Sequence, residues 1–388
     1  MPAGFILSSD VGNDHSMQTL TMTASSRLAL LVPDLRGGGA ERVMLNLAIG
    51  LAEIGCQVDL VVAVARGSYL KDVPPAVNLV DLKSRDVAVC LPALVRYLKS
   101  AKPAGLVSAL SQANVSAILA KKLSGVDTRV LAVSHNSLSV ESKNGKSLKL
   151  KVMPYFVRAF FPSADVLAGV STGVCTDLAQ MLNMPAERVK VLYNPVISEK
   201  TLTMSTEPVD HPWLAEGEPP VILTVGRLHP QKNHALLVDA FAKLRAKREA
   251  RLMILGEGDL RPEIEEQVKR LGLVDDVALP GFVANPFAYM SKAAVFALSS
   301  RFEGLPTVLI EALACGARVV STDCPSGPDE ILRGGQYGAL VPVDNVDALA
   351  DALRQTLDSG QAPPPESWQP YRIVEASRRY LDALGFDN

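Results

Sequence analysis

Short apolar runs alternate with segments of helical spacing along most of the chain. Such alternation is typical of α/β proteins, in which helices connect the strands of a parallel sheet. The apolar runs predict strands at residues 28–32, 58–63, 77–82, 105–109, 129–133, 166–169 and 189–192, and then at 221–225, 251–258 with its glycine turn, 277–283, 295–298, 318–321 and 339–341. Helical spacing predicts helices at residues 91–99, 114–123, 172–182, 261–271, 305–314, 346–357 and 371–384. The pattern therefore indicates two doubly wound sheets.

The turn signal Asn194-Pro195 and a polar, proline-containing segment at residues 197–219 separate the two halves. We expect a Rossmann-like N-terminal domain at 27–196, a linker at 197–219, a second Rossmann-like domain at 220–370 and a C-terminal helical segment at 371–388. Two such domains leave a cleft between their parallel sheets. The first 26 residues are polar, do not read as a signal peptide and are expected to be disordered.

Composition narrows the class of protein. Apolar residues make up 48% and charged residues 21% of the 388 positions, as in a globular protein with a sizeable core. The net charge of −2 supplies no global basic field, which argues against nucleic acid as a partner. No apolar run approaches the ~20 residues of a membrane span. The five scattered cysteines predict buried free thiols in a reducing compartment, and hence a cytoplasmic protein.

The first candidate site lies in the loop that precedes the predicted helix at 305–314. The loop follows a predicted strand, and open α/β sheets bind ligands at the carboxyl ends of their strands. The amides of the first helical turn form an anion site, and Pro306 has no N–H to lose there. Glu303 and Glu311 place a carboxylate on either side of this site. A nucleotide sugar, with hydroxyls on both sides of its phosphates, has the matching layout.

The second candidate site is the loop after the predicted strand at 221–225. Gly226 permits a sharp turn, and Arg227 and Lys232 stand five residues apart in a loop, where both side chains can converge on one anion. The alternative is that both are ordinary solvated cations. His229 and His234 are interpreted as turn and cap residues, because no Asp or Glu is near enough to complete a metal site.

Two loops in the first half also follow predicted strands, at the carboxyl ends where ligands bind. Three consecutive glycines, including Gly38 and Gly39, precede a helix and form either a flexible turn or a close backbone approach to a phosphate or an acceptor. His135 follows a predicted strand, on the rim where ligands bind.

Together these segments resemble family 4 of the retaining GT-B glycosyltransferases. The resemblance is carried by the E-x7-E spacing of Glu303 and Glu311, by R-F-E-G-L-P around the first of them, by G-R-L-x-x-Q-K from Gly226 and by G-G-A-E-R from Gly38. It covers nearly all of residues 28–384. It implies the GT-B fold, a last helix that crosses back to the first domain, a donor on the second domain and an acceptor on the first.

The resemblance also implies a role for each motif residue. The catalytic candidates are Glu303 at the sugar hydroxyls, His135 near the donor sugar, and Arg227 and Lys232 at the leaving diphosphate. The donor-binding candidates are Gly38, Gly39, Gly226, Phe282 beside the base, Gly304, Leu305, Pro306, Thr307 and Glu311 at the ribose.

The implied reaction moves a sugar from a nucleoside diphosphate sugar, above all a UDP-sugar, to a glycan or a lipid-linked glycan with retention of configuration. The chain contains no D-x-D triplet, so cations and backbone amides would stabilise the leaving group. We expect no metal and no cofactor. Two alternatives stay open: another GT-B enzyme, such as a phosphorylase or an epimerase, and a non-catalytic subunit that binds nucleotide sugars.

The stretch from Lys143 to Phe161 mixes cations with large apolar side chains. One interpretation is a segment that lies on an anionic membrane surface, on the inner face of the cell membrane. The other is an ordinary amphipathic helix, packed on one side and solvated on the other. Pro154 is expected to break or kink a helix here.

Overall fold

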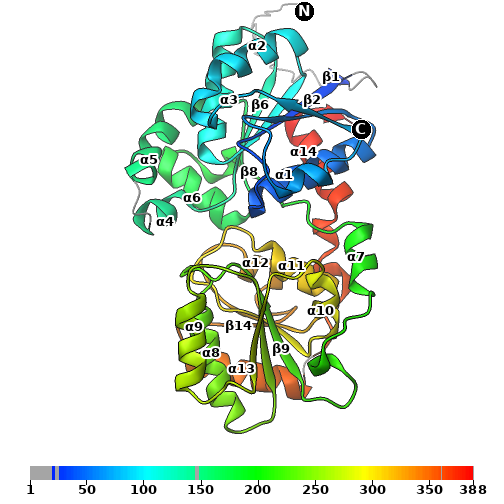
Figure 1. The fold of residues 1–388 in the computed structure, drawn as a ribbon. Helices are drawn as coiled ribbons and strands as arrows, with labels where there is room; N and C mark the ends of the chain where they lie inside the picture. Colours follow the sequence, from blue (N-terminus) through cyan, green and yellow to red (C-terminus); the bar gives the residue numbers. More distant parts are fainter. Residues whose placement is uncertain (1–19, 22–25, 145–147, 360, 388) are drawn as a thin grey trace, which may run out of the picture.

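The computed structural model describes residues 20–21, 26–144, 148–359 and 361–387, which form two α/β domains stacked end to end (Figure 1). The first domain is built on a seven-stranded parallel sheet in the order β4-β3-β2-β5-β6-β7-β8. Its strands are β2 (Arg27–Val32), β3 (Gln57–Val62), β4 (Val77–Asp81), β5 (Gly105–Ala109), β6 (Arg129–Ser134), β7 (Val166–Gly169) and β8 (Val189–Val191). β2, β3, β5, β6 and β7 are nearly or fully buried because helices cover both faces of the sheet, whereas the edge strand β4 is mostly exposed.

The second domain is built on a six-stranded parallel sheet in the order β11-β10-β9-β12-β13-β14. Its strands are β9 (Val221–Val225), β10 (Arg251–Leu255), β11 (Val277–Gly281), β12 (Val295–Leu298), β13 (Val319–Thr322) and β14 (Ala339–Val341). In both sheets every pairing is parallel. The expected fold of two doubly wound parallel-sheet domains is confirmed.

Helices lie close to every predicted position, and further helices that the sequence pattern did not predict lie between them. The helices are α1 (Gly39–Glu53), α2 (Leu91–Ala101), α3 (Ser111–Ser124), α4 (Leu138–Asn144), α5 (Leu148–Phe160), α6 (Thr172–Leu182), α7 (Glu199–Ser205), α8 (His234–Arg245), α9 (Arg261–Arg270), α10 (Pro286–Lys292), α11 (Thr307–Ala314), α12 (Pro328–Leu332), α13 (Val346–Ser359) and α14 (Ile373–Leu384). The expectation of a break at Pro154 is wrong, since α5 runs through it as one helix. Packing supplies the reason: Val157 and Phe161 are fully buried in the core shared with α3 and α6.

The chain passes between the domains twice, at neighbouring positions. The amides of Val196 and Ile197 both donate to the carbonyl of Tyr371, and the amide of Ile373 donates back to Ile197. The rings of Tyr193 and Tyr371 pack 5.1 Å apart, centre to centre, beside these bonds. Residues 197–219, expected to be a linker, contain α7.

After the second crossing, α14 packs against α1 in the first domain, as Figure 1 shows for the red and blue helices. A Cβ atom on Gly50 of α1 would lie 2.2 Å from Ser377 Oγ, so the two helices approach closely. β15 (Phe386–Asp387) then pairs with β1 (Leu20–Thr21). The predicted disorder of residues 1–26 concerns positions that lie mostly outside the described residues. The domain boundaries drawn from the sequence stay a prediction.

Strand order fixes where a ligand would bind. In the first sheet the order reverses between β2 and β5, and in the second between β9 and β12. Open α/β sheets bind ligands outside the carboxyl ends of the strands at such a switch point. The loops that follow β2, β9 and β12 hold the glycine run, the Arg227–Lys232 pair and Glu303, respectively.

Candidate functional site

Two loops of the second domain form the base of the site. They follow the neighbouring strands β9 and β12 and are hydrogen-bonded to each other. The hydroxyl of Ser299 donates to the carbonyl of Lys232 at 2.9 Å, and the amide of Arg301 donates to the carbonyl of Gln231 at 2.8 Å. The side chain of Gln231 donates to the carbonyl of Phe302 at 2.9 Å. These bonds hold the two loops in one register.

The centre of the site is a buried ion pair between Lys232 and Glu303. Lys232 Nζ lies 2.6 Å from Glu303 Oε1, and the side chains are 21% and 8% exposed. The Ser300 hydroxyl donates to the same oxygen at 2.6 Å, and Gln231 Nε2 donates to Oε2 at 3.4 Å. A buried carboxylate loses its hydration. The ammonium group of Lys232 and the hydrogen bonds from Ser300 and Gln231 compensate Glu303 for that loss.

Helix α11 begins directly after this pair. Pro306 is its N-cap and Thr307 its first residue, and no side chain caps the amides of the first turn. The amide of Leu309 donates to the carbonyl of Pro306 at 3.1 Å, and the amides before it are available to an anion. Gly316, with φ of +79°, ends the helix as the sequence predicted.

Glu311 lies on α11 and faces the first domain. Burial raises its pKa to about 7, and the charges of Arg42 and Lys232 act in the opposite direction. A carboxyl group with this pKa is partly protonated near neutral pH. Arg42 belongs to α1, so a cation of the first domain stands near this carboxyl group.

The glycine loop of the first domain leads into α1. Gly38 is the N-cap, Gly39 is the first helical residue, and both are exposed. A Cβ atom on Gly39 would meet nothing within 4 Å. Arg42 is held beside this loop because its guanidinium lies 3.8 Å from the ring centre of Tyr69 and donates to Asp72 at 2.8 Å.

His135 lies across from the Glu303 loop. A Cβ atom on Gly304 would lie 1.8 Å from the carbonyl oxygen of His135, so the two backbones are in direct contact. The imidazole Nε2 is buried and has no hydrogen-bond partner among the described residues. Burial lowers the pKa of His135 to about 4, and the ring is therefore neutral at pH 7. A neutral imidazole has one donor and one acceptor nitrogen, so it can donate a hydrogen bond to a hydroxyl group or accept one from it.

Arg227 and Phe282 stand apart from the buried pair, whereas Gly226 lies beside it, because a Cβ atom on Gly226 would lie 3.7 Å from the side chain of Lys232. Gly226 is packed against the next loop, where Gly256 has φ of +132° and a Cβ atom there would lie 2.1 Å from the Gly226 carbonyl. Arg227 is exposed. Phe282 follows β11, the edge strand of the sheet, and is 83% exposed. Solvent-facing groups of this kind are free to contact a ligand.

The two other loop histidines take structural positions. His229 Nδ1 accepts a hydrogen bond from the amide of Gln231 at 3.3 Å, which is a turn contact. His234 is the first residue of α8 and is 2% exposed; the N-cap is Asn233, so the interpretation of His234 as a cap residue is wrong. Within the described residues, no group of three or more His, Cys, Asp or Glu side chains is placed to hold a metal ion.

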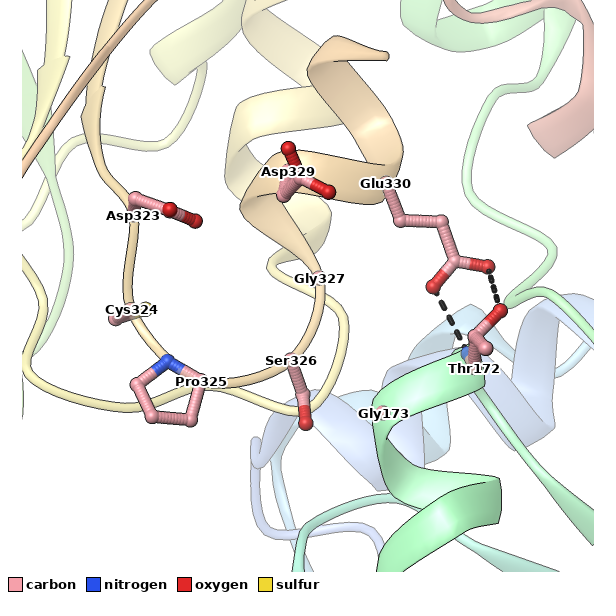
Figure 2. Close-up of a pocket in the computed structure, with 9 residues that line it drawn as sticks. All are labelled: Thr172, Gly173, Asp323, Cys324, Pro325, Ser326, Gly327, Asp329 and Glu330. Atoms are coloured by element: carbon pink, nitrogen blue, oxygen red, sulfur yellow. Dashed lines mark hydrogen bonds between the residues drawn. The ribbon is translucent and has the colours of Figure 1, made fainter. Parts of the chain in front are cut away.

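A pocket of about 590 Å³ opens between the domains beside the Glu303 loop (Figure 2). It lies between the start of α6 and the segment from Asp323 to Glu330, which is a loop that leads into α12. Its lining residues are Thr172, Gly173, Asp323, Cys324, Pro325, Ser326, Gly327, Asp329 and Glu330. Across it, Glu330 accepts hydrogen bonds from the amide and the hydroxyl of Thr172, drawn as dashed lines in Figure 2.

Sequence reasoning missed several residues of the site. Ser300 and Gln231, which bond Glu303, stand inside the recognised motifs, but hydroxyl and amide side chains are common in loops and gave no signal of their own. Arg42 stands inside the recognised G-G-A-E-R segment, yet its proximity to Glu311 depends on how the domains meet. The pocket residues had one signal, a polar run after a predicted strand.

The amphipathic stretch from Lys143 to Phe161 covers the end of α4, all of α5 and the first residue of the turn after it, and its residues 145–147 lie outside the described residues. On α5 the side chains of Lys151, Tyr155, Phe156 and Arg158 are exposed, with Tyr155 at 70% and Phe156 at 47%. Phe161 is buried in the core. The stretch therefore packs on one side and presents rings and cations on the other. Among the described residues, no helix combines the length and the apolar character needed to cross a bilayer.

Comparisons with known proteins point to glycosyltransferases. Residues 37–200 match the family model described as Glycosyltransferase Family 4, and residues 219–359 match the one described as Glycosyl transferases group 1. The chain is 31% identical over 342 residues to the N-acetylgalactosamine-N,N'-diacetylbacillosaminyl-diphospho-undecaprenol 4-alpha-N-acetylgalactosaminyltransferase of Campylobacter jejuni, which covers 86% of this chain and 90% of that protein.

Two further proteins show the same likeness. The amylovoran biosynthesis glycosyltransferase AmsD of Erwinia amylovora is 27% identical over 86% of this chain and 91% of its own length. The crystal structure of Anabaena HepE in complex with UDP superposes with a TM-score of 0.73 at 20% identity, and the match covers 92% of this chain and 99% of HepE. At that identity the superposition shows a shared fold.

Proposed function

The chain belongs to family 4 of the glycosyltransferases and has their GT-B fold, and from this premise we propose that it is a retaining enzyme that transfers a sugar from a UDP-sugar to a lipid-linked glycan. The observation that carries the proposal is the convergence of Lys232, Glu303 and the free amides of α11 at the switch point of the second sheet. Cationic, amide and carboxylate groups in one place suit a diphosphate with hydroxyl groups beside it.

The donor lies on the second domain in this proposal. Lys232, Arg227 and the amides of Gly304, Leu305 and Thr307 bind the diphosphate. Glu303 binds hydroxyls of the sugar, and Glu311 accepts from the ribose. Phe282 lies against the base and His135 lies near the sugar. UDP bound to the structurally similar HepE supports a uridine nucleotide as the first donor to test.

The chemical step breaks the bond between the anomeric carbon and the diphosphate oxygen. The electron pair goes to the leaving diphosphate, and the acceptor hydroxyl forms the new bond on the same face of the sugar. The hydroxyl proton goes to a phosphate oxygen of the leaving group. Lys232 and Arg227 stabilise the charge that develops on the diphosphate, so the reaction proceeds without a metal ion. Fixed donors of this kind lower the activation free energy by ~3–4 kcal/mol each.

The acceptor in this proposal is a glycan attached through diphosphate to a polyprenol. The Campylobacter relative is named for such an acceptor, and the Erwinia relative is named for the biosynthesis of amylovoran. The exposed face of α5 suits the same assignment, because Lys151 and Arg158 flank two exposed rings. Cations beside aromatic rings favour contact with an anionic lipid surface.

The test begins with a panel of nucleotide sugars and a thermal shift measurement, because a bound donor raises the melting temperature. The donors that bind are then incubated with the protein and a short-chain polyprenyl-diphosphate sugar in EDTA. We expect transfer, with the same anomeric configuration in product and donor by NMR. An inverted product, or transfer that strictly requires manganese, would contradict the proposal.

A further inference from the structure

The two domains meet through hydrogen bonds that surround the carbonyl of Gly304. The hydroxyl of Ser171 donates to that carbonyl at 2.8 Å. The hydroxyls of Ser137 and Ser326 lie 3.2 Å apart. Glu330 accepts from Thr172 and, at 2.7 Å, from the hydroxyl of Tyr193 at the crossing between the domains. Ser137, Ser171 and Thr172 all follow β6 or β7, at the carboxyl edge of the first sheet.

Ser171 makes two contacts with one hydroxyl group. Its Oγ accepts a hydrogen bond from the amide of Val174 at 3.4 Å, as the N-cap of α6, and donates its only proton to Gly304. The residue is fully buried. The start of α6 thereby sets the position of the Gly304 carbonyl, which belongs to the other domain.

Gly304 is the residue after Glu303, and the first domain restricts what can stand there. Its φ is not positive, so its own backbone conformation does not require glycine. The restriction comes from His135, whose carbonyl oxygen would lie 1.8 Å from a Cβ atom. His135 belongs to the first domain and Gly304 to the second, so this backbone contact exists only when the two domains touch.

We propose that Ser171 is a positioning residue, which fixes the Glu303–Gly304 loop against His135 when the two domains are in contact. Glu330 supports the same contact by joining the start of α6 to Tyr193 at the crossing, as the close-up in Figure 2 shows for Thr172. Ser171 acts through Gly304 and does not touch the donor. This inference rests on the proposed transfer reaction.

The consequence is a separation between nucleotide binding and turnover. Lys232, Arg227, the amides of α11 and Glu311 all belong to the second domain, so UDP binding does not need Ser171. Turnover does need it, because the sugar must meet groups from both domains. Misplacing such groups slightly is enough to slow an enzyme ~10²-fold.

The test compares Ser171→Ala with the wild-type full-length protein. We expect kcat to fall at least about tenfold while the Kd for UDP, by calorimetry, stays within about twofold. Ser171→Thr keeps the hydroxyl and should recover turnover. Ser171→Gly removes the hydroxyl at little cost to helix capping, and it serves if the alanine variant is poorly folded.

A capping control separates this role from simple destabilisation. Asn345 Oδ1 accepts from the amide of Ala348 at 3.0 Å at the start of α13. Asn345→Ala removes that cap and should lower the melting temperature without changing kcat. The inference is overturned if Ser171→Ala retains the wild-type kcat, or if its loss in UDP affinity equals its loss in kcat. Absence of transfer by the wild-type protein would instead contradict the proposed function.

Discussion

The Nζ atom of Lys232 lies 2.6 Å from Oε1 of Glu303, and the hydroxyl of Ser300 donates to the same oxygen. The pair joins two loops that are 71 residues apart in sequence. A diphosphate that contacts Lys232 would share the ammonium group with Glu303. Binding at the phosphates and placement of the carboxylate at the sugar are thereby coupled through one side chain.

Replacement of Lys232 tests this coupling. Lys232→Ala should lower turnover by ~10²-fold or more, because it removes a fixed cation from the charge that develops on the leaving group. Initial rates with saturating donor and acceptor measure the effect. Lys243→Ala is the matched control, since Lys243 pairs with Asp347 on the surface. A Lys232→Ala enzyme with the wild-type rate would remove the diphosphate assignment.

Glu311 makes the stability of the free protein depend on pH. Its pKa is raised from 4.5 to about 7 by burial, so the folded state binds more protons than the unfolded state between these values. The contribution of this group to stability is therefore fully present at pH 4.5 and below, and it falls as the pH rises to about 7, by on the order of 3 kcal/mol.

Urea unfolding of the wild-type protein and Glu311→Gln at pH 5, 6, 7 and 8 measures this dependence. The glutamine variant lacks the titrating group, so it should gain stability relative to the wild type up to pH 7 and then keep a constant margin. Parallel profiles for the two proteins would show that Glu311 has an ordinary pKa.

Phe282 should contribute to nucleotide binding without contributing to the fold. The side chain is 83% exposed, so its removal leaves packing unchanged. Stacking of a base on an aromatic ring contributes ~1–3 kcal/mol, which predicts that Phe282→Ala weakens UDP binding about tenfold or more. Calorimetry measures the Kd. Phe282→Tyr should retain binding, and Val274→Ala, at another exposed apolar position, should change nothing. Equal affinities for Phe282→Ala and the wild type would place the base elsewhere.

The exposed face of α5 should bind anionic vesicles. We expect the protein to co-sediment with phosphatidylglycerol-containing vesicles at low salt, and less so at high salt because the cations are screened. Replacing Tyr155 and Phe156 by alanine should reduce binding. Leu123→Ala is the control, since Leu123 is 61% exposed on α3. A wild-type protein that stays in the supernatant at low salt would leave α5 as a solvated helix.

The sequence was sufficient for features that depend on nearby residues. The strands were predictable because each is a compact apolar run, and the end of α11 because Gly316 adopts a left-handed conformation. Resemblance to known motifs then pointed to Lys232 and Glu303. Their contact was not predictable, because it follows from the adjacency of β9 and β12 in the sheet.

Contacts between the two domains could not be predicted from the sequence. The bond from Ser171 to Gly304 spans 133 residues, and neither residue's neighbours indicate the other. Pro154 shows the opposite failure. A local rule predicted an interruption, and the packing of α5 overrides it.

The return of α14 to the first domain makes the order of synthesis matter. Because α14 covers α1, a ribosome must complete the whole second domain before the first can bury that surface. A gene divided between the two domains would yield an N-terminal fragment with α1 uncovered and a C-terminal fragment whose α14 has lost its packing partner. Separate production of the halves would require grafting the terminal helix onto the front fragment.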